Sequence, residues 1–198
     1  MPYTAEHKQE TRSRIVRSAR RLFNRSGFSD VSITDIMADA GLTHGGFYKH
    51  FSAKEDLYEV AVLQFIQAEI PEAWQRQHVD PNAEGPELAR MILDAYLSDD
   101  HFADREASCP MIALPSDVSR GNARVKSAFR QVLEMMVSAF AGNLAPSPRP
   151  SRERALALVS MLVGAMVLAR SVDEPGLATE LRDSARKQAF EAAGWDWD

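Results

Sequence analysis

Residues 41–51 read GLTHGGFYKHF, and this stretch decides how the chain is interpreted. Gly45 and Gly46 are adjacent, although each glycine in a helix costs about 1 kcal/mol relative to alanine. Aromatic and basic side chains follow directly. Because glycine adds no side-chain bulk, two glycines at this place indicate a helix whose backbone comes close to another molecule. We expect Phe47 and Phe51 to fix this helix to a hydrophobic core.

The residues before this stretch predict two further helices. Over residues 6–26, apolar side chains recur at helical spacing, at Ile15, Ala19, Leu22 and Phe23. A second helix begins at Ser32, where Ser32 and Asp35 have the spacing of a capping box, and it ends at Gly41. With a third helix over residues 44–50, these elements describe a helix-turn-helix, whose second helix enters the major groove of DNA.

The charge of the chain is unevenly distributed. The whole chain has a net charge of −5, whereas residues 1–54 hold nine Lys and Arg against five Asp and Glu. The remaining residues are therefore strongly acidic, and the basic N-terminal part is the part suited to nucleic acid. The arginines of the first predicted helix have a second interpretation, because a run of charge is often only a solvated face and few of them are needed at phosphate groups.

The polar side chains of residues 43–50 suit the two kinds of DNA contact. Thr43 and His44 carry groups that hydrogen-bond to base edges. Tyr48, Lys49 and His50 suit phosphate oxygens, which position a protein without specifying a sequence.

The run D-I-x-x-x-A-G-L-T-x-G-G-F-Y-x-H-F-x-x-K-E-x-L, from Asp35 to Leu57, resembles the DNA-binding signature of the TetR/AcrR family of bacterial transcriptional regulators. The resemblance extends over roughly residues 11–65. It implies a homodimer in which each N-terminal head binds half of a palindromic operator in double-stranded DNA. It also implies a variable C-terminal part that binds a small-molecule effector, whose identity the sequence does not give.

The resemblance implies roles for individual residues as well. Ser32 and Thr34 are expected to contact phosphate. The residues expected to face the bases are Thr43, His44, Gly45 and Gly46. Those expected to hold the DNA backbone are Tyr48, Lys49, His50 and Lys54.

The apolar spacing is helical throughout, so we expect an all-α fold of about nine helices. A capping box at residues 52–55 opens a long fourth helix, which Pro71 bends or ends. Further helices are expected over residues 84–98, 108–119, 122–143, 152–172 and 176–193. We expect a helix-turn-helix DNA-binding domain over residues 1–54, joined by the fourth helix to a ligand-binding and dimerisation domain over residues 55–198.

The last two predicted helices have the composition of an interface. They combine apolar side chains with small residues that let helices approach closely. The resemblance implies that they pair with the same helices of a second subunit in a four-helix bundle. The expected interface residues are Leu156, Val159, Ser160, Val163, Gly164, Val167, Leu177, Leu181 and Ala185.

Methionines and aromatic side chains in the C-terminal part are candidates for an adaptable ligand pocket. The candidates are Trp74, Met91, Tyr96, Phe102, Cys109, Met111, Phe129 and Met136. For each single residue, however, an ordinary place in the core is the favoured interpretation. Cys109, the single cysteine, could be an inert buried thiol or a redox sensor, since a sensor needs exposure and a lowered pKa.

Several classes of protein are disfavoured. A single cysteine precludes an internal disulfide and fits a reducing compartment. The N-terminal residues lack the apolar segment of a signal peptide, and the most apolar run, residues 155–169, is shorter than the roughly 20 residues that cross a membrane. We therefore expect a cytoplasmic protein with no membrane partner. The histidines lack metal-ligand spacing and no nucleotide-binding or hydrolase motif occurs, so we expect no metal, no cofactor and no enzymatic activity.

These observations favour a DNA-binding regulator, most readily a ligand-inducible repressor. They do not distinguish repression from activation. The alternative is a small-molecule binding or sequestering protein whose head does not bind DNA.

Overall fold

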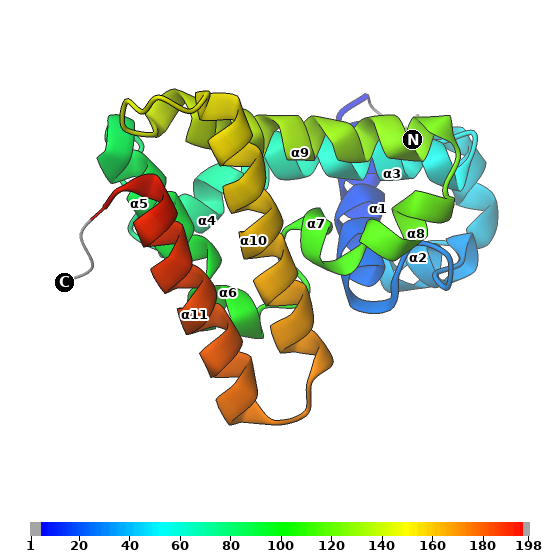
Figure 1. Ribbon diagram of the computed structural model, residues 1–198. Helices are drawn as coiled ribbons and strands as arrows, with labels where there is room; N and C mark the ends of the chain where they lie inside the picture. The colour runs from blue at the N-terminus through cyan, green and yellow to red at the C-terminus, as the bar shows by residue number, and fades with distance from the viewer. Residues whose placement is uncertain (1–4, 196–198) are drawn as a thin grey trace. The chain divides into compact units, whose positions relative to one another are not determined.

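The computed structural model describes residues 5–195, without the side chains of residues 68 and 69, and these residues form helices and no strand (Figure 1). The prediction of an all-α fold is confirmed. The chain forms two compact units. The first consists of Met1–Ala68 and Arg105–Arg130, and the second of Glu69–Asp104 and Gln131–Asp198. The functional division predicted between residues 54 and 55 stays a prediction.

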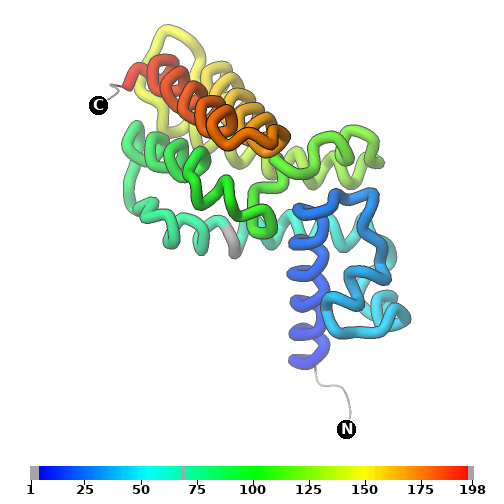
Figure 2. Tube along the Cα trace, turned by 90° about the horizontal axis from the view of Figure 1, so that it is seen from below, coloured from blue at the N-terminus to red at the C-terminus, as the bar shows by residue number. Residues whose placement is uncertain are grey.

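The first unit begins with the three elements of the predicted head. These are α1 (Ala5–Ser26), α2 (Ile33–Asp39) and the 3-10 helix η1 (His44–Lys49). They are followed by α3 (Lys54–Gln64), and the chain later returns to this unit as α7 (Pro110–Ala113), α8 (Pro115–Arg120) and the first part of α9 (Ala123–Asn143). Figure 2 shows α2 and η1, in lighter blue, beside the dark blue α1.

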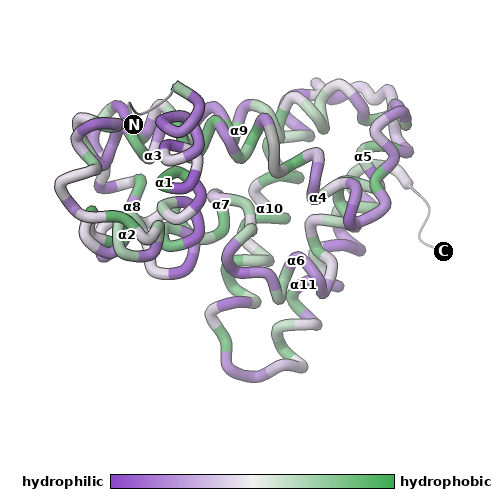
Figure 3. The backbone as a smooth tube through the Cα atoms, turned by 180° about the vertical axis from the view of Figure 1, so that it is seen from behind, coloured by the Kyte–Doolittle hydropathy of each residue, from purple (hydrophilic) through white to green (hydrophobic). Residues whose placement is uncertain are grey.

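Apolar side chains at the predicted spacing form the core of the first unit. Ile15, Ala19 and Phe23 on α1 are buried, which confirms the predicted stripe, and Phe47 on η1 is fully buried with them. Figure 3 shows hydrophilic and hydrophobic segments alternating along α1, as a helix with one buried side requires. Tyr58 on α3 packs against Phe23 with 5.9 Å between the ring centroids. Each fully buried side chain of this size contributes about 1.5–3 kcal/mol.

One of the two predicted capping boxes is present. The Ser32 hydroxyl accepts a hydrogen bond from the Asp35 N–H at 3.1 Å, and the Asp35 carboxylate accepts one from the Ser32 N–H at 2.9 Å. The capping box predicted at residues 52–55 is wrong. α3 begins at Lys54 with Ala53 as its N-cap and no side-chain bond, and Ser52 donates instead to the carboxylate of Asp56.

Three helix boundaries differ from the sequence prediction. Residues 44–50 give a 3-10 helix rather than an α-helix, and Thr43 makes no side-chain bond at its start. Pro71 does not end the helical path. A π-helical turn, η2 (Phe65–Glu69), leads directly into α4 (Ile70–Arg76), and Pro71 is the second residue of α4. The helix predicted over residues 108–119 is divided into α7 and α8 at Pro115.

The second unit contains α4, α5 (Gly85–Tyr96), α6 (Asp99–Ala103), the remainder of α9, α10 (Ser151–Ser171) and α11 (Pro175–Ala193). The predicted bounds of α5, α9, α10 and α11 agree with these to about two residues. α10 and α11 lie side by side in Figures 1 and 2. The Glu174 carboxylate caps α11 by accepting hydrogen bonds from the N–H groups of Gly176 at 2.9 Å and Leu177 at 2.7 Å.

Two arginines tie the short helix α6 to α10 and α11. Arg170 on α10 donates to the Asp104 carbonyl at 3.1 Å, at the end of α6 where carbonyls lack helical partners. Arg182 on α11 is buried, donates to the Leu97 carbonyl at 3.1 Å and pairs with Asp99 at 2.7 Å. Both ends of α6 are therefore held by the last two helices.

The apolar run of residues 155–169 lies within a longer helix than the sequence indicated. α10 has 21 residues and is long and apolar enough to cross a membrane by length and composition. Its most apolar window is 39 % buried inside the structure. One such helix is weak evidence for a membrane span, because a core helix of the same length passes the same test. The expectation that this helix is too short to cross a membrane is therefore wrong.

The segment before α7 is fastened to α1. Arg20, which is buried, donates to the Ala107 carbonyl at 2.9 Å, and Asn24 donates to the Ser108 carbonyl at 2.7 Å. The partners in these bonds are 87 and 84 residues apart in the sequence. The three-helix head therefore shares its compact unit with residues from far along the chain.

Asp117 on α8 supports the turn after α1, because its carboxylate accepts hydrogen bonds from the Phe28 N–H at 2.8 Å and the Ser29 hydroxyl at 3.0 Å. We predict that Asp117→Ala lowers the free energy of unfolding by about 2 kcal/mol at pH 7, since the Phe28 N–H loses its acceptor. Burial acts to raise the pKa of Asp117, but hydrogen bonds from Ser29, Phe28 and Arg120 outweigh it and hold the pKa below 3.8. The stabilisation is therefore present above pH 3.8 and is lost as the pH falls through the lowered pKa of the folded state.

Urea unfolding of the wild type and Asp117→Ala across this pH range measures both effects. The difference in stability should be largest near neutral pH and should shrink in acid. Asp183→Ala, which removes an exposed carboxylate from α11, is the control and should unfold like the wild type. Equal stability of Asp117→Ala and the wild type at pH 7 would contradict the prediction.

Candidate nucleic-acid interface

The turn between α2 and η1 is built from backbone hydrogen bonds and one glycine. Gly41 has a φ of +67°, which other residues rarely adopt. Its N–H donates to the Ala38 carbonyl at 2.9 Å, and the Leu42 N–H donates to the Met37 carbonyl at 2.8 Å. This pair of bonds is a Schellman motif, so α2 ends at a fixed residue and the chain leaves it in a fixed direction.

η1 presents a polar face to solvent. Phe47 is fully buried, whereas Tyr48, the next residue, is 60 % exposed. Thr43, His44 and Lys49 are exposed as well, and the His44 and Tyr48 rings meet edge-on with 6.0 Å between centroids. This exposed set provides donors and acceptors for base edges and a cation for phosphate.

The two glycines of η1 have different surroundings. A Cβ on Gly45 would meet no atom within 4 Å, so Gly45 keeps the outer surface open. Gly46 is half-buried, and a Cβ there would lie 3.4 Å from the Met37 side chain. Gly45 therefore lies where a close approach to DNA is expected. Gly46 lies against the Met37 side chain of α2, and the expectation that it faces the bases stays a prediction.

Ser32 and Thr34 lie at the N-terminal end of α2, and both are exposed. The Ser32 hydroxyl is already engaged, because it donates to the Asp35 carboxylate at 2.6 Å. Hydrogen bonds from the Ser32 side chain and backbone lower the pKa of Asp35, so a carboxylate stands beside this hydroxyl. Thr34 is therefore the better placed of the two for a phosphate group.

His50 follows η1 and is half-buried. Its Nδ1 atom is buried and has no hydrogen-bond partner among residues 5–195. Burial is the main cause that lowers the pKa of His50 from 6.5, and the positive charges of Lys8, Arg12 and Lys49 add to it. The ring is therefore neutral at pH 7, and a contact with phosphate would be a neutral hydrogen bond.

Lys54 was expected at the DNA backbone, but its ammonium group is bonded inside the first unit. It donates to the carbonyls of Phe28 at 2.7 Å and Val31 at 2.9 Å, and it lies 4.5 Å from the centroid of the Phe28 ring. Burial lowers the pKa of Lys54. These bonds join α3 to the turn between α1 and α2, so the structure gives Lys54 a role in holding the head together.

The arginines of α1 do not form one solvated face. Arg20 is buried, and Arg21 donates to both carboxylate oxygens of Asp39 at 2.6 Å. Arg17 is exposed and has no bonded partner in the described part of the chain. The sequence analysis missed the structural role of Arg20. A signal was present, because Arg20 and Asn24 are four residues apart and so share one side of the helix.

Known proteins match this chain most clearly over the head. Residues 15–61 match the family described as bacterial regulatory proteins, tetR family. Over these residues the chain is similar to the TetR family. Its members are transcriptional regulators and not enzymes, which agrees with the polar surface found on η1.

Curated TetR-family relatives match a short stretch of the chain. AcrR of Shigella flexneri is 44 % identical over 55 residues, which are 28 % of this chain and 26 % of the relative. TtgR of Pseudomonas putida is 39 % identical over 56 residues, which are 28 % of this chain and 27 % of the relative. The matched stretch thus spans about a quarter of the length of these relatives.

Solved structures, a TetR-family regulator among them, resemble nearly the whole chain. The reduced form of NemR from E. coli has a TM-score of 0.74 at 17 % identity and covers 92 % of this chain and 96 % of its own. A regulator from Agrobacterium tumefaciens has a TM-score of 0.74 at 20 % identity, with 91 % and 97 % covered. A regulator from Saccharomonospora viridis in complex with choline has a TM-score of 0.69 at 17 % identity, with 92 % and 96 % covered. At these identities the likeness establishes the fold.

The residues expected to line a ligand pocket are divided between the two units. The second unit contains Trp74, Met91, Tyr96, Phe102 and Met136, and the first contains Cys109, Met111 and Phe129. Tyr96, Met136, Cys109 and Met111 are buried, and the other four are half-buried. A pocket common to these residues stays a prediction. The burial of Cys109 fits the inert thiol better than the exposed sensor. In the described part of the chain, no three His, Cys, Asp or Glu side chains form a metal site.

α10 and α11 carry exposed apolar side chains, and the intersubunit face expected on these helices stays a prediction. Leu156 and Leu177 are each 40 % exposed, and Leu168, which the sequence analysis missed, is 56 % exposed. The spacing contained no signal for Leu168, because twelve residues at about 100° each place it about 120° away from Leu156 around the helix axis. Of the other expected residues, Ser160 is exposed, and Val163, Gly164, Val167 and Leu181 are half-buried.

Two residues of the expected interface are placed differently. Val159 and Ala185 are both buried within the second unit. Their assignment to an intersubunit face is therefore corrected, because these side chains already pack inside the subunit. Small and apolar residues at helical spacing do not by themselves distinguish the two sides of such a helix.

We predict that Lys54→Met lowers the free energy of unfolding by about 2 kcal/mol, because it keeps the apolar stem but leaves the Phe28 and Val31 carbonyls without a charged donor. Lys49→Met removes an exposed ammonium from the same unit and should leave stability unchanged while weakening DNA binding. Thermal and urea unfolding, together with DNA binding measured by anisotropy, separate the two effects. Unchanged stability of Lys54→Met would show that the ammonium group is not needed to hold the head together.

Proposed function

We propose that this TetR-family protein is a transcriptional repressor that binds operator DNA through η1 and the start of α2. The observation that carries the proposal is the contrast between the fully buried Phe47 and the 60 % exposed Tyr48 beside it. Exposure of a large aromatic ring is unfavourable in water, so its place between His44 and Lys49 supports an external partner. A tyrosine hydroxyl and a lysine ammonium both suit phosphate oxygens, which fix the position of a protein on a duplex.

We propose further that two subunits pair through α10 and α11. Leu156, Leu168 and Leu177 expose apolar surface on these two helices. A second copy of the same surface would remove it from water, as in a two-fold interface where one patch meets its own copy. Two heads held in this way would bind the halves of a palindromic operator about one helical turn apart.

Release from the operator is proposed to follow binding of a small molecule in the C-terminal part. The structural neighbour from S. viridis is in complex with choline, which supports a small-molecule effector for this chain without identifying it. Such an effector needs only a higher affinity for the form that does not bind DNA. A protein that acts on chromosomal operators in this way is expected in the cytoplasm.

The rival function is a small-molecule binding protein whose head does not bind DNA. The exposed polar side chains on η1 disfavour this rival, because a head that does not bind DNA has no need to expose Tyr48 beside Lys49. The two functions differ in what substitutions on η1 would change. Ligand affinity should be the same in both, whereas DNA affinity should respond only if the head is active.

We predict that Tyr48→Ala combined with Lys49→Ala lowers operator affinity by at least about tenfold, because two phosphate contacts are lost. The slope of log K against log salt should also become shallower by about one to two, since fewer counterions are released. Anisotropy of a labelled operator, selected from random DNA, measures both quantities at several salt concentrations. A scrambled duplex of the same length gives the non-specific reference.

The matched control is Lys126→Ala, which removes an exposed lysine from α9 in the same compact unit. It should bind the operator like the wild type. Wild-type protein that binds operator candidates and scrambled duplexes equally would favour the sequestering protein. Wild-type discrimination that survives the double substitution would instead show that η1 is not the interface.

We predict that Leu168→Asp weakens dimerisation by at least about tenfold, because a carboxylate would have to be desolvated at the interface. Analytical ultracentrifugation should then shift the variant at micromolar concentration toward the monomer mass of 22.0 kDa. Ser138→Asp adds the same charge at an exposed position of α9 and should leave the dimer intact. A Leu168→Asp variant that remains fully dimeric would exclude this helix face as the interface.

A further inference from the structure

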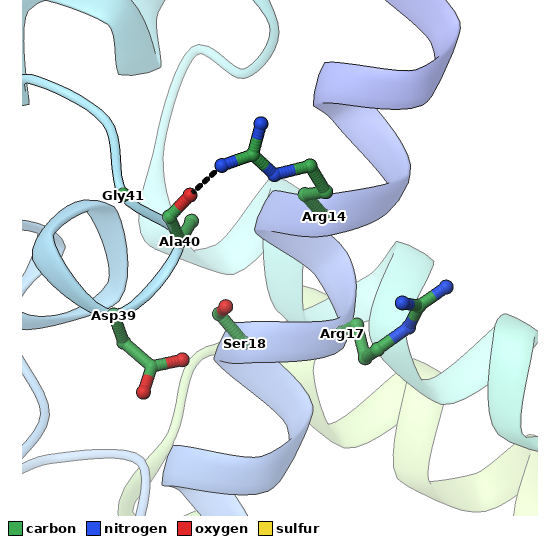
Figure 4. Close-up of a pocket in the computed structure, with 6 residues that line it drawn as sticks. All are labelled: Arg14, Arg17, Ser18, Asp39, Ala40 and Gly41. Carbon is green, nitrogen blue, oxygen red and sulfur yellow. Dashed lines mark hydrogen bonds between the residues drawn. The ribbon is translucent and has the colours of Figure 1, made fainter.

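We propose that Arg14 positions η1 for base recognition by holding the carbonyl of Ala40, a role that rests on the proposed DNA-binding function. Arg14 lies on α1, outside the stretch from α2 to η1 that carries the expected DNA contacts. Its Nη2 atom donates to the Ala40 carbonyl oxygen at 2.5 Å (Figure 4). This bond ties α1 to the residue immediately before the glycine of the turn.

The Ala40 carbonyl has no backbone donor to replace this bond. The Schellman motif satisfies the carbonyls of Met37 and Ala38, and no backbone N–H of the described residues donates to Ala40. Ala40 itself is buried at 4 % exposure. A partly buried carbonyl left without a donor is destabilising, so the guanidinium adds to the Gly41 N–H bond in holding the peptide group after Ala40.

Gly41 fits the same arrangement. A Cβ at this position would lie 3.2 Å from the Arg14 Nη2 atom. A larger residue would therefore crowd the guanidinium at the Ala40 carbonyl. The absence of a side chain at Gly41 serves the positive φ of the turn and the close approach of Arg14 together.

The charged side chains next to Arg14 do not compete with the Ala40 carbonyl for its guanidinium. Asp39 lines the same hollow of about 260 Å³, but both of its oxygens accept hydrogen bonds from Arg21 at 2.6 Å. Arg17 also lines the hollow, and its guanidinium points away from Ala40 (Figure 4). Arg14 and Arg17 thus carry the same charge on the same helix, and of these two Arg14 is the one bonded to the turn.

The bond matters for recognition because the start of η1 is weakly fixed by other groups. Thr43 makes no side-chain cap there, and the two glycines contribute no side chains. Base contacts in the major groove require accurate placement of η1, whereas phosphate contacts are shared along the duplex. Loss of the Arg14 bond should therefore reduce discrimination between operator and unrelated DNA more than it reduces general affinity.

The test compares Arg14→Ala and Arg14→Lys with Arg17→Ala as the matched control, in the full chain. Arg14→Ala should lower operator affinity about tenfold, the size of one lost base contact, and leave the affinity for a scrambled duplex and the salt slope unchanged. Arg14→Lys keeps a donor and should recover most of the loss. Hydrogen–deuterium exchange of residues 40–43 in the free protein should increase in Arg14→Ala and not in Arg17→Ala. Thermal unfolding establishes that each variant is folded at the assay temperature.

Three results would overturn the positioning role. Arg14→Ala could bind the operator like the wild type, or Arg17→Ala could lose the same discrimination. A salt slope that becomes shallower by about one in Arg14→Ala would instead make Arg14 a direct phosphate ligand. If wild-type protein does not discriminate operator from scrambled DNA, the proposed function fails. Hydrogen–deuterium exchange of residues 40–43 then decides separately whether Arg14 holds the turn. If Arg14→Ala exchanges there like the wild type, Arg14 does not hold the turn.

Discussion

Burial of Phe47 is the interaction on which the rest of the candidate interface depends. η1 is a six-residue 3-10 helix with two glycines, and a segment of this length is not stable alone. Full burial of the Phe47 ring contributes about 1.5–3 kcal/mol, which is comparable with the roughly 2 kcal/mol that two glycines cost a helix. Packing against the core, rather than helix propensity, therefore keeps Tyr48 and Lys49 at the surface in a fixed place.

The fold could be predicted from the sequence where a pattern is local and unique. The capping box at Ser32 is of this kind, because one acidic residue stands at the required spacing. Ser52 is followed by both Glu55 and Asp56, so the local pattern could not show that Asp56 is the partner. Contacts such as that between Asn24 and Ser108 leave no local pattern at all, because 84 residues of chain separate the two partners.

For the candidate DNA-binding site, too, the sequence alone predicts only part of the structure. A sequence signature contains residues that contact DNA and residues that hold the head together, and it does not separate them. The exposed Tyr48 fits the first group, whereas Lys54 is bonded to carbonyls of the turn after α1 and fits the second. Only burial and hydrogen bonding distinguish the groups. On α10 the same reasoning separates the exposed Leu156 from the buried Val159.

Charge in the head divides in a similar way. Residues 1–54 contain nine Lys and Arg, but several are bonded to carbonyl or carboxylate groups within the first unit, namely Arg14, Arg20, Arg21 and Lys54. A cation that keeps its internal partner releases no counterion when DNA binds. The salt dependence of binding should therefore follow a smaller set that includes the exposed Lys49, rather than the total count. Part of the basic charge holds the helices in the arrangement that lets the remaining cations reach phosphate.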